Sequence, residues 1–178
     1  MAAAEGDAQT LIHAAEILHA EDDLDGAIHA YSRALALQPS DRVRTYALVC
    51  RGSAKDEAGD FDGAVADYDE AIALAPDDPG AWFMRGLAHQ GRENWLVALS
   101  DFDAAIGRDP ANAEFYAARG VTRCRVANWQ GAGEDFARAM VLSARRLKRL
   151  REEQRRTSSS GVHDRALLFA RRKDRRFG

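Results

Sequence analysis

Cysteine, proline and aromatic residues are scarce in this 178-residue chain. The two cysteines, Cys50 and Cys124, are far apart and form no CxxC pair, which favours a reducing compartment over a disulfide framework. Only four prolines interrupt the chain, so long helices can form. No apolar run approaches the ~20 residues that span a bilayer. The first ten residues contain two acids and no base, which argues against a secretory signal. We therefore expect a cytoplasmic all-α protein, with a nuclear location also compatible in a eukaryote.

Sequence motifs for catalysis are missing as well. The chain has no GxxxxGK[ST] phosphate loop, no GxGxxG and no HExxH. His13, Glu16 and His19 share roughly one helix face, but three residues on one helix converge poorly on a metal ion. Cys124 stands between two arginines that favour a thiolate, yet no base accompanies it. The sequence therefore predicts a protein that is not an enzyme and needs no cofactor or metal.

Charge is distributed unevenly along the chain. Residues 1–143 contain 12 Lys and Arg against 24 Asp and Glu, a net charge of −12. Residues 144–178 contain 13 against 4, a net charge of +9. An acidic body thus carries a basic tail, and the two parts favour different partners.

An internal repeat dominates the first three-quarters of the chain. The pattern Ala-x3-aromatic-x2-Ala occurs four times, at steps of 37, 34 and 34 residues: Ala27/Tyr31/Ala34, Ala64/Tyr68/Ala71, Ala98/Phe102/Ala105 and Ala132/Phe136/Ala139. Arg-Gly pairs recur upstream in the last three copies, ending in Gly52, Gly86 and Gly120. Pro39, Pro76 and Pro110 follow at matching offsets. A period of this length is typical of stacked helical hairpins, which bury their apolar faces only against neighbouring copies.

Each copy is predicted to form two helices that pack closely at the small residues, with the aromatic ring filling the space between hairpins. The expected helices are 8–21, 24–37, 45–58, 61–75, 79–92, 95–108, 113–126 and 129–143. The last three copies also have an arginine and, sixteen residues later, an aspartate: Arg51/Asp67, Arg85/Asp101 and Arg119/Asp135. We expect these pairs to form salt bridges within each hairpin, since pairing with the preceding hairpin would leave Arg51 opposite Ala30. Independent exposed charges are the alternative.

These residues resemble the tetratricopeptide repeat, and the third copy is the most similar, with Trp82-x2-Arg85-Gly86-x2-His89, then Ala98-x3-Phe102, then Pro110. Arginine replaces the usual leucine before the glycine, and the first copy has no glycine there. The resemblance implies an all-α, right-handed superhelical solenoid with a lead at 1–7 and repeats at 8–41, 45–78, 79–112 and 113–143.

The resemblance also implies a function and a binding face. In that family the first helix of each repeat lines a concave groove that holds a peptide, which makes the chain an adaptor or scaffold. The matching positions here are Ile12, His13, Glu16, Val49, Cys50, Ser53, Asp56, Phe83, Met84, Leu87, Ala117 and Val121, with Gln9 and Tyr46 beside them. Such a groove suits an amphipathic helix or an extended segment that has apolar anchors and some basic residues. Several of these side chains, Phe83 and Leu87 above all, could instead pack between helices.

One known use of the fold is not expected. Family members that hold the acidic C-termini of heat-shock chaperones use a clamp of basic residues and asparagine. The matching positions here are Ile12, Glu16, Cys50, Gly80 and Met84, none of which is Lys, Arg or Asn.

The basic tail leaves several uses open. The last helix is expected to continue through 144–156 as a capping extension, with an apolar stripe that could also pair with a second chain. A Ser-rich linker at 157–161 and a short basic helix at 163–176 would complete the basic tail, 157–178, whose cations include Arg171, Arg172, Lys173, Arg175 and Arg176. The tail could dock in the acidic face of its own or another copy, bind nucleic acid, bind another polyanion, or remain solvated. A monomer or weak dimer is expected.

Overall fold

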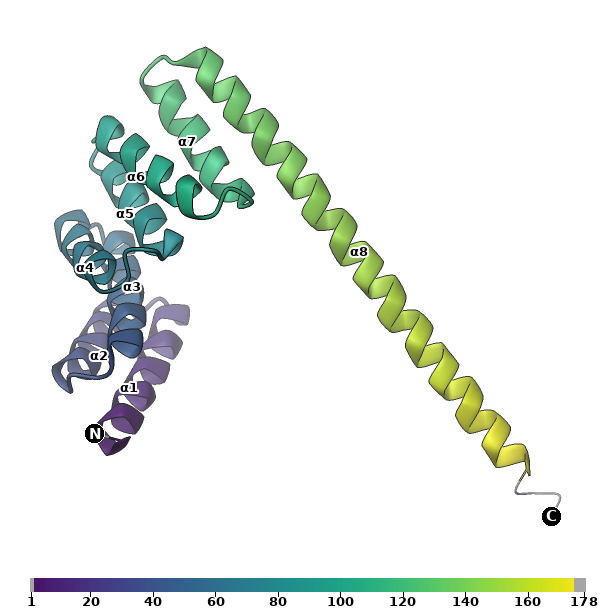
Figure 1. Ribbon diagram of the computed structural model, residues 1–178. Helices are drawn as coiled ribbons and strands as arrows, with labels where there is room; N and C mark the ends of the chain where they lie inside the picture. Colours follow the sequence, from purple (N-terminus) through teal and green to yellow (C-terminus); the bar gives the residue numbers. More distant parts are fainter. Residues whose placement is uncertain (1, 175–178) are drawn as a thin grey trace. The chain divides into compact units, whose positions relative to one another are not determined.

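The computed structural model describes residues 2–174 of the chain, with side chains described from residue 5 to 156. These residues form helices and no strands (Figure 1). The helices are α1 (Ala2–Ala20), α2 (Leu24–Ala36), α3 (Asp41–Glu57), α4 (Phe61–Leu74), α5 (Pro79–Gly91), α6 (Trp95–Arg108), α7 (Ala113–Arg125) and α8 (Trp129–Asp174). The chain divides into two compact units, Met1–Ala139 and Met140–Gly178. Among the helices of this part of the chain, none has both the length and the apolar character needed to cross a bilayer.

In the first two hairpins, the turn between the helices is built from an acidic cap and a glycine. Asp60 accepts a hydrogen bond from the backbone N–H of Gly63 at 3.0 Å, and Asp23 caps α2 in the same way. A Cβ atom on Gly63 would lie 2.1 Å from the Asp60 carboxylate, so the cap requires glycine at this position. In the third hairpin Val97 occupies the equivalent place, and Asn94 makes no side-chain cap bond. The small residue after each helix start therefore decides whether the cap forms.

The first unit is a stack of helical hairpins. Helix α1 packs on α2, α3 on α4 and α5 on α6, and successive hairpins meet through α2–α3, α4–α5 and α6–α7 (Figure 1). Within the last three hairpins the recurring spacing brings a glycine against a ring. A Cβ atom on the glycine would lie 2.6–2.8 Å from that ring, in the pairs Gly52–Tyr68, Gly86–Phe102 and Gly120–Phe136. The predicted close approach of the two helices is confirmed.

The repeated aromatic residues form the core between hairpins, with one exception. Tyr31, Tyr68 and Phe102 are at most 1% exposed. Phe136, the fourth member of the series, is 38% exposed. The first three rings are covered by the following hairpin, whereas the first unit has no fifth hairpin to cover Phe136.

Two helices begin earlier than the repeat predicts. Helix α1 starts at Ala2 rather than residue 8, so the expected lead is helical, in keeping with its alanine-rich sequence. Helix α3 starts at Asp41 rather than residue 45 and has 17 residues, compared with 13 in α5 and in α7. The longer step of 37 residues between the first two copies is thus absorbed as an additional turn of α3.

The expected linker and separate short helix in the tail are also wrong, because α8 is one helix of 46 residues that includes positions 157–161 and 163–174. Serine lowers helix stability by only about half a kcal/mol per residue relative to alanine, and the neighbouring Arg, Leu and Ala residues favour a helix. The predicted cations Arg171, Arg172 and Lys173 lie beyond the described side chains. Arg175 and Arg176 lie outside the described residues altogether.

Candidate binding cleft

Buried salt bridges align the first helix with the second in the last three hairpins. In all three predicted pairs the arginine Nε and Nη2 atoms donate to the two aspartate oxygens, at 2.8 and 2.5 Å for Arg51–Asp67. The Arg85–Asp101 distances are 3.0 and 2.6 Å, and the third pair repeats them. The aspartate side chains are only 2–4% exposed. The expected pairing within each hairpin is confirmed.

The same arginines also bind the preceding hairpin, a contact that the sequence analysis disfavoured. The remaining nitrogen of Arg85, Nη1, donates to Asp69 at 2.5 Å, and Arg119 donates to Asp103 at the same distance. At the equivalent position, the Nη1 atom of Arg51 donates to the Ser32 hydroxyl at 3.1 Å. Each arginine therefore joins two hairpins, and the stack of helices is held in register. This ladder of arginine bridges fixes α3, which supplies one wall of the candidate site.

A third group supports two of the buried aspartates. The Nζ atom of Lys55 lies 2.9 Å from Asp67, and Arg123 lies 2.9 Å from Asp135. The third hairpin has His89 at this position. Its Nδ1 atom is buried without a hydrogen-bond partner, and burial lowers the pKa of the imidazole below its usual value. His89 is therefore neutral near pH 7 and cannot supply the cation that the other two hairpins have.

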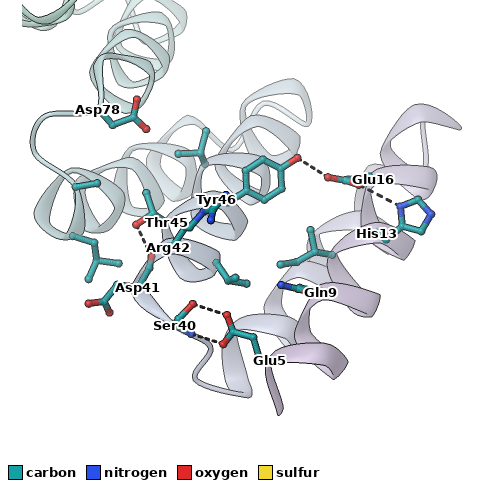
Figure 2. A pocket seen from close by; sticks show the side chains of 15 residues that line it. Glu5, Gln9, His13, Glu16, Ser40, Asp41, Arg42, Thr45, Tyr46 and Asp78 are labelled. Atoms are coloured by element: carbon teal, nitrogen blue, oxygen red, sulfur yellow. Dashed lines mark hydrogen bonds and ion pairs between the residues drawn. The ribbon is translucent and has the colours of Figure 1, made fainter. Parts of the chain in front are cut away.

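Helices α1, α3, α5 and α7 contact one another in consecutive pairs and form one face of the stack. A cleft of about 970 Å³ opens in this face between α1 and α3 (Figure 2). Its lining comes from three segments: Glu5, Gln9, Ile12, His13 and Glu16 of α1; Ser40 and, from α3, Asp41, Arg42, Val43, Thr45, Tyr46 and Val49; and Leu74, Ala75 and Asp78 at the α4–α5 connection.

The cleft is created by the two early helix starts. Glu5, in the first turns of α1, accepts hydrogen bonds from the Ser40 N–H at 3.0 Å and from its hydroxyl at 2.5 Å. These bonds lower the pKa of the Glu5 carboxyl, the side-chain bond more than the backbone one. The additional turn of α3 supplies Asp41, Arg42 and Val43. Without these segments the cleft would lose the walls at its lower end in Figure 2.

A hydrogen-bonded chain crosses the other end of the cleft. The Tyr46 hydroxyl donates to Glu16 at 2.5 Å, and His13 Nδ1 lies 3.5 Å from the same carboxylate (Figure 2). The bond to Glu16 is the largest cause of a raised pKa at Tyr46, which stays protonated at neutral pH. Tyr46 is nevertheless 52% exposed, so its ring is available to a ligand.

The lining combines an apolar floor with an acidic rim. Ile12, Val43, Val49 and Leu74 provide hydrophobic surface. Four carboxylates and one guanidinium provide the charge: Glu5, Glu16, Asp41, Asp78 and Arg42. The rim has a net charge of −3 with His13 neutral, which favours a ligand with cationic side chains.

The structure places only four of the twelve predicted groove residues at this cleft: Ile12, His13, Glu16 and Val49. Cys50 lies beside them, and burial raises the pKa of its thiol. Ser53 and Asp56 are further along α3 and partly buried. Burial, and secondarily the Glu57 charge, raise the pKa of the Asp56 carboxyl.

The predicted residues of the later hairpins are separate from the cleft, and Phe83 is part of the core. Phe83 is 8% exposed, and its ring centroid lies 5.7 Å from that of Phe102 and 4.8 Å from that of Phe115. Met84 and Leu87 are partly buried against the same cluster. The alternative that Phe83 packs between helices is the one observed, because α7 covers it. Of the remaining two, Ala117 is partly buried and Val121 is 48% exposed.

Sequence reasoning missed Glu5, Ser40 and the first turn of α3 because the repeat pattern does not include them. One signal was present: the 37-residue step exceeds the other two by three residues, and those residues had to lie between the first two copies. Among the described residues, no group of three or more His, Cys, Asp or Glu side chains is arranged to hold a metal ion.

Comparison with known proteins agrees with this architecture. Two sequence models described as tetratricopeptide repeat match residues 8–41 and 54–120. The chain belongs to the tetratricopeptide repeat family, as the sequence motifs predicted. No curated protein matches the chain.

Several solved structures are similar in fold. MamA 41-end from Desulfovibrio magneticus RS-1 is 22% identical with a TM-score of 0.71, over 78% of this chain and 76% of that one. The first TPR of Spaghetti (RPAP3) bound to HSP90 peptide SRMEEVD is 21% identical with a TM-score of 0.64, over 69% and 98%. The Arabidopsis OM64 TPR domain is 19% identical with a TM-score of 0.64, over 68% and 98%. At these identities the similarity establishes the fold, an all-α tetratricopeptide solenoid.

Proposed function

We propose that this chain is an adaptor that binds a peptide or helix of a partner protein on the α1–α3–α5–α7 face, with the main contacts in the cleft between α1 and α3. The supporting observation is the cleft itself, which combines apolar surface, an exposed tyrosine ring and an acidic rim. Tyrosine is enriched at the centres of protein interfaces because it buries a large area with few rotatable bonds. Acidic rim groups steer and orient cationic ligands.

The ligand that fits has apolar anchors flanked by Lys or Arg. Ile12, Val49 and Leu74 would take the anchors, and Glu16 and Asp41 would face the cations. The RPAP3 domain bound to an HSP90 peptide supports peptide binding as a use of this fold. That peptide, SRMEEVD, has three acids. We do not propose such a ligand for this chain, since Glu16 and Cys50 stand where a basic clamp would be needed.

A displayed library of random peptides tests this proposal on the full chain. We expect selection of sequences with apolar and basic residues, whose binding weakens at least ~10-fold in Tyr46→Ala, the equivalent of about 1.4 kcal/mol. Glu16→Lys should weaken the basic ligands in particular. Asp25→Lys, an exposed acid on α2 with the same change of charge, is the matched control. Unchanged binding in both cleft variants would refute the assignment of the site.

The separation of charge between the two units favours a second candidate, in which the basic tail tethers the module to nucleic acid. Residues 157–178 contain six Lys and Arg and two Asp, and such cations neutralise phosphates without sequence preference. Retention on a nucleic-acid column that falls steeply with salt, and that is lost when residues 157–178 are removed, would support it. Retention that is insensitive to salt or to this deletion would exclude it.

A further inference from the structure

The described part of the second unit is an amphipathic basic helix. Within residues 140–156, Met140, Leu147 and Leu150 are 73%, 49% and 46% exposed. Their spacing of seven and three residues places them on one side of α8. Arg145 and Arg149 lie roughly opposite, and the segment has a net charge of +5. A helix of this kind is suited to an acidic groove with an apolar floor.

The cleft between α1 and α3 has the complementary properties. Its floor is apolar, and its rim has a net charge of −3 with His13 neutral. The same complementarity holds for the whole units: Met1–Ala139 has a net charge of −12 and Met140–Gly178 a net charge of +9. The helix thus has the apolar and cationic side chains that the proposed ligand of this cleft needs.

We propose that the cleft of one copy binds the 140–156 segment of α8 from a second copy of this chain. The proposal rests on the proposed function, because it uses the same cleft and names its occupant. Docking of the segment in the cleft of its own copy would instead leave the protein monomeric at every concentration. Pairing of two such segments with each other would bring like charges together. The contact is heterologous, because the cleft of one copy binds the segment of another. Each copy offers both surfaces, so further copies can be added in the same way.

A mixing experiment with two full-length variants tests this geometry. The segment variant carries Leu147→Ser and Leu150→Ser, which leaves every charge in place. The cleft variant carries Glu16→Lys and Asp41→Lys, both at partly or fully exposed positions. Mass is followed by sedimentation equilibrium at low salt, relative to the 19.5 kDa monomer. Circular dichroism confirms that both variants keep their helix content.

The wild-type protein should associate with rising concentration, and its association should weaken as salt is raised. Each variant alone should associate at least ~10-fold more weakly, from the loss of two leucine contacts or of the charge match. A mixture of the two variants should form a 1:1 dimer, because the intact segment of the cleft variant can still enter the intact cleft of the segment variant. Arg149→Ser, on the opposite side of α8, should associate within about threefold of wild type.

Three outcomes overturn the proposal. Persistent monomers at all concentrations would show that the segment does not bind in trans. Association of the segment variant alone as strong as wild type would exclude this face of α8. Failure of the mixture to form a dimer while each single variant is weakened would indicate a symmetric contact between like surfaces. If any of these results occurs while Tyr46→Ala still weakens the binding of library peptides, the proposed occupant is wrong and the proposed function stands. If both experiments fail, the cleft itself is wrong.

Discussion

Replacing Asp101 by asparagine removes one charge from the buried ladder while keeping the shape of the side chain. Asp101 is 2% exposed and accepts two bonds from Arg85, at 3.0 and 2.6 Å. Breaking a buried pair from one side costs about 3–5 kcal/mol when a charge is left uncompensated. Arg85 is itself 19% exposed and retains Asp69, so we expect the lower end, about 3 kcal/mol.

Asp69→Asn is the matched control, because it removes a charge from the same arginine. The Asp69–Arg85 distance is 2.5 Å, as short as the buried contact, but the Asp69 side chain is 56% exposed. Exposed pairs contribute about 0–1 kcal/mol. The two sites hardly differ in distance, but Asp101 is buried and accepts two bonds whereas Asp69 is exposed and accepts one. The comparison therefore tests burial together with the second bond, and not distance.

The assay is urea unfolding followed by circular dichroism at the helix band. With a slope of about 2 kcal/mol per molar urea, the midpoint should fall by about 1.5 M in Asp101→Asn and by less than about 0.5 M in Asp69→Asn. A common slope in the two variants would show that the change is in stability alone. Equal losses in the two variants would falsify the view that burial, and not distance, determines the strength of these bridges.

Three smaller perturbations test other parts of the structure. Gly86→Ala should destabilise the fold by about 1–3 kcal/mol in thermal unfolding, since the new Cβ would lie 2.6 Å from the Phe102 ring. Gly107→Ala should stabilise the fold by up to about 1 kcal/mol, because the new Cβ would face open space and alanine favours a helix. Asp60→Ala should cost about 1 kcal/mol of stability in the same assay through loss of the α4 cap. Asp56→Asn should raise Tm at pH 7: the folded-state pKa of Asp56 is raised, so its contribution to stability is largest at low pH and is lost as pH rises through the folded pKa. The advantage of asparagine should therefore shrink as pH falls toward 4, and a gain independent of pH would contradict this cause.

The ion pairs show which contacts the repeat spacing can predict and which it cannot. The arginines and aspartates recur at a fixed offset of sixteen residues, and an offset within one hairpin determines a contact because two antiparallel helices joined by a short turn have one register. The contacts of Arg85 with Asp69 and Arg119 with Asp103 were harder to predict. They depend on how one hairpin is placed on the next, which the offset does not specify.

The sequence by itself determined the helical hairpins, their order and the small residues at which they meet, because these depend on local helix preference and on contacts inside one repeat. Only the tertiary structure decided which surface is free. Phe83 belongs to the first-helix pattern, yet α7 covers it and it packs in the core. Glu5 and Ser40 lie outside the pattern, yet they meet across 35 residues and close one end of the cleft. A repeat identifies the residues that share a helix face, but whether that face is covered depends on the neighbouring helices in space, and this is where the candidate binding site is formed.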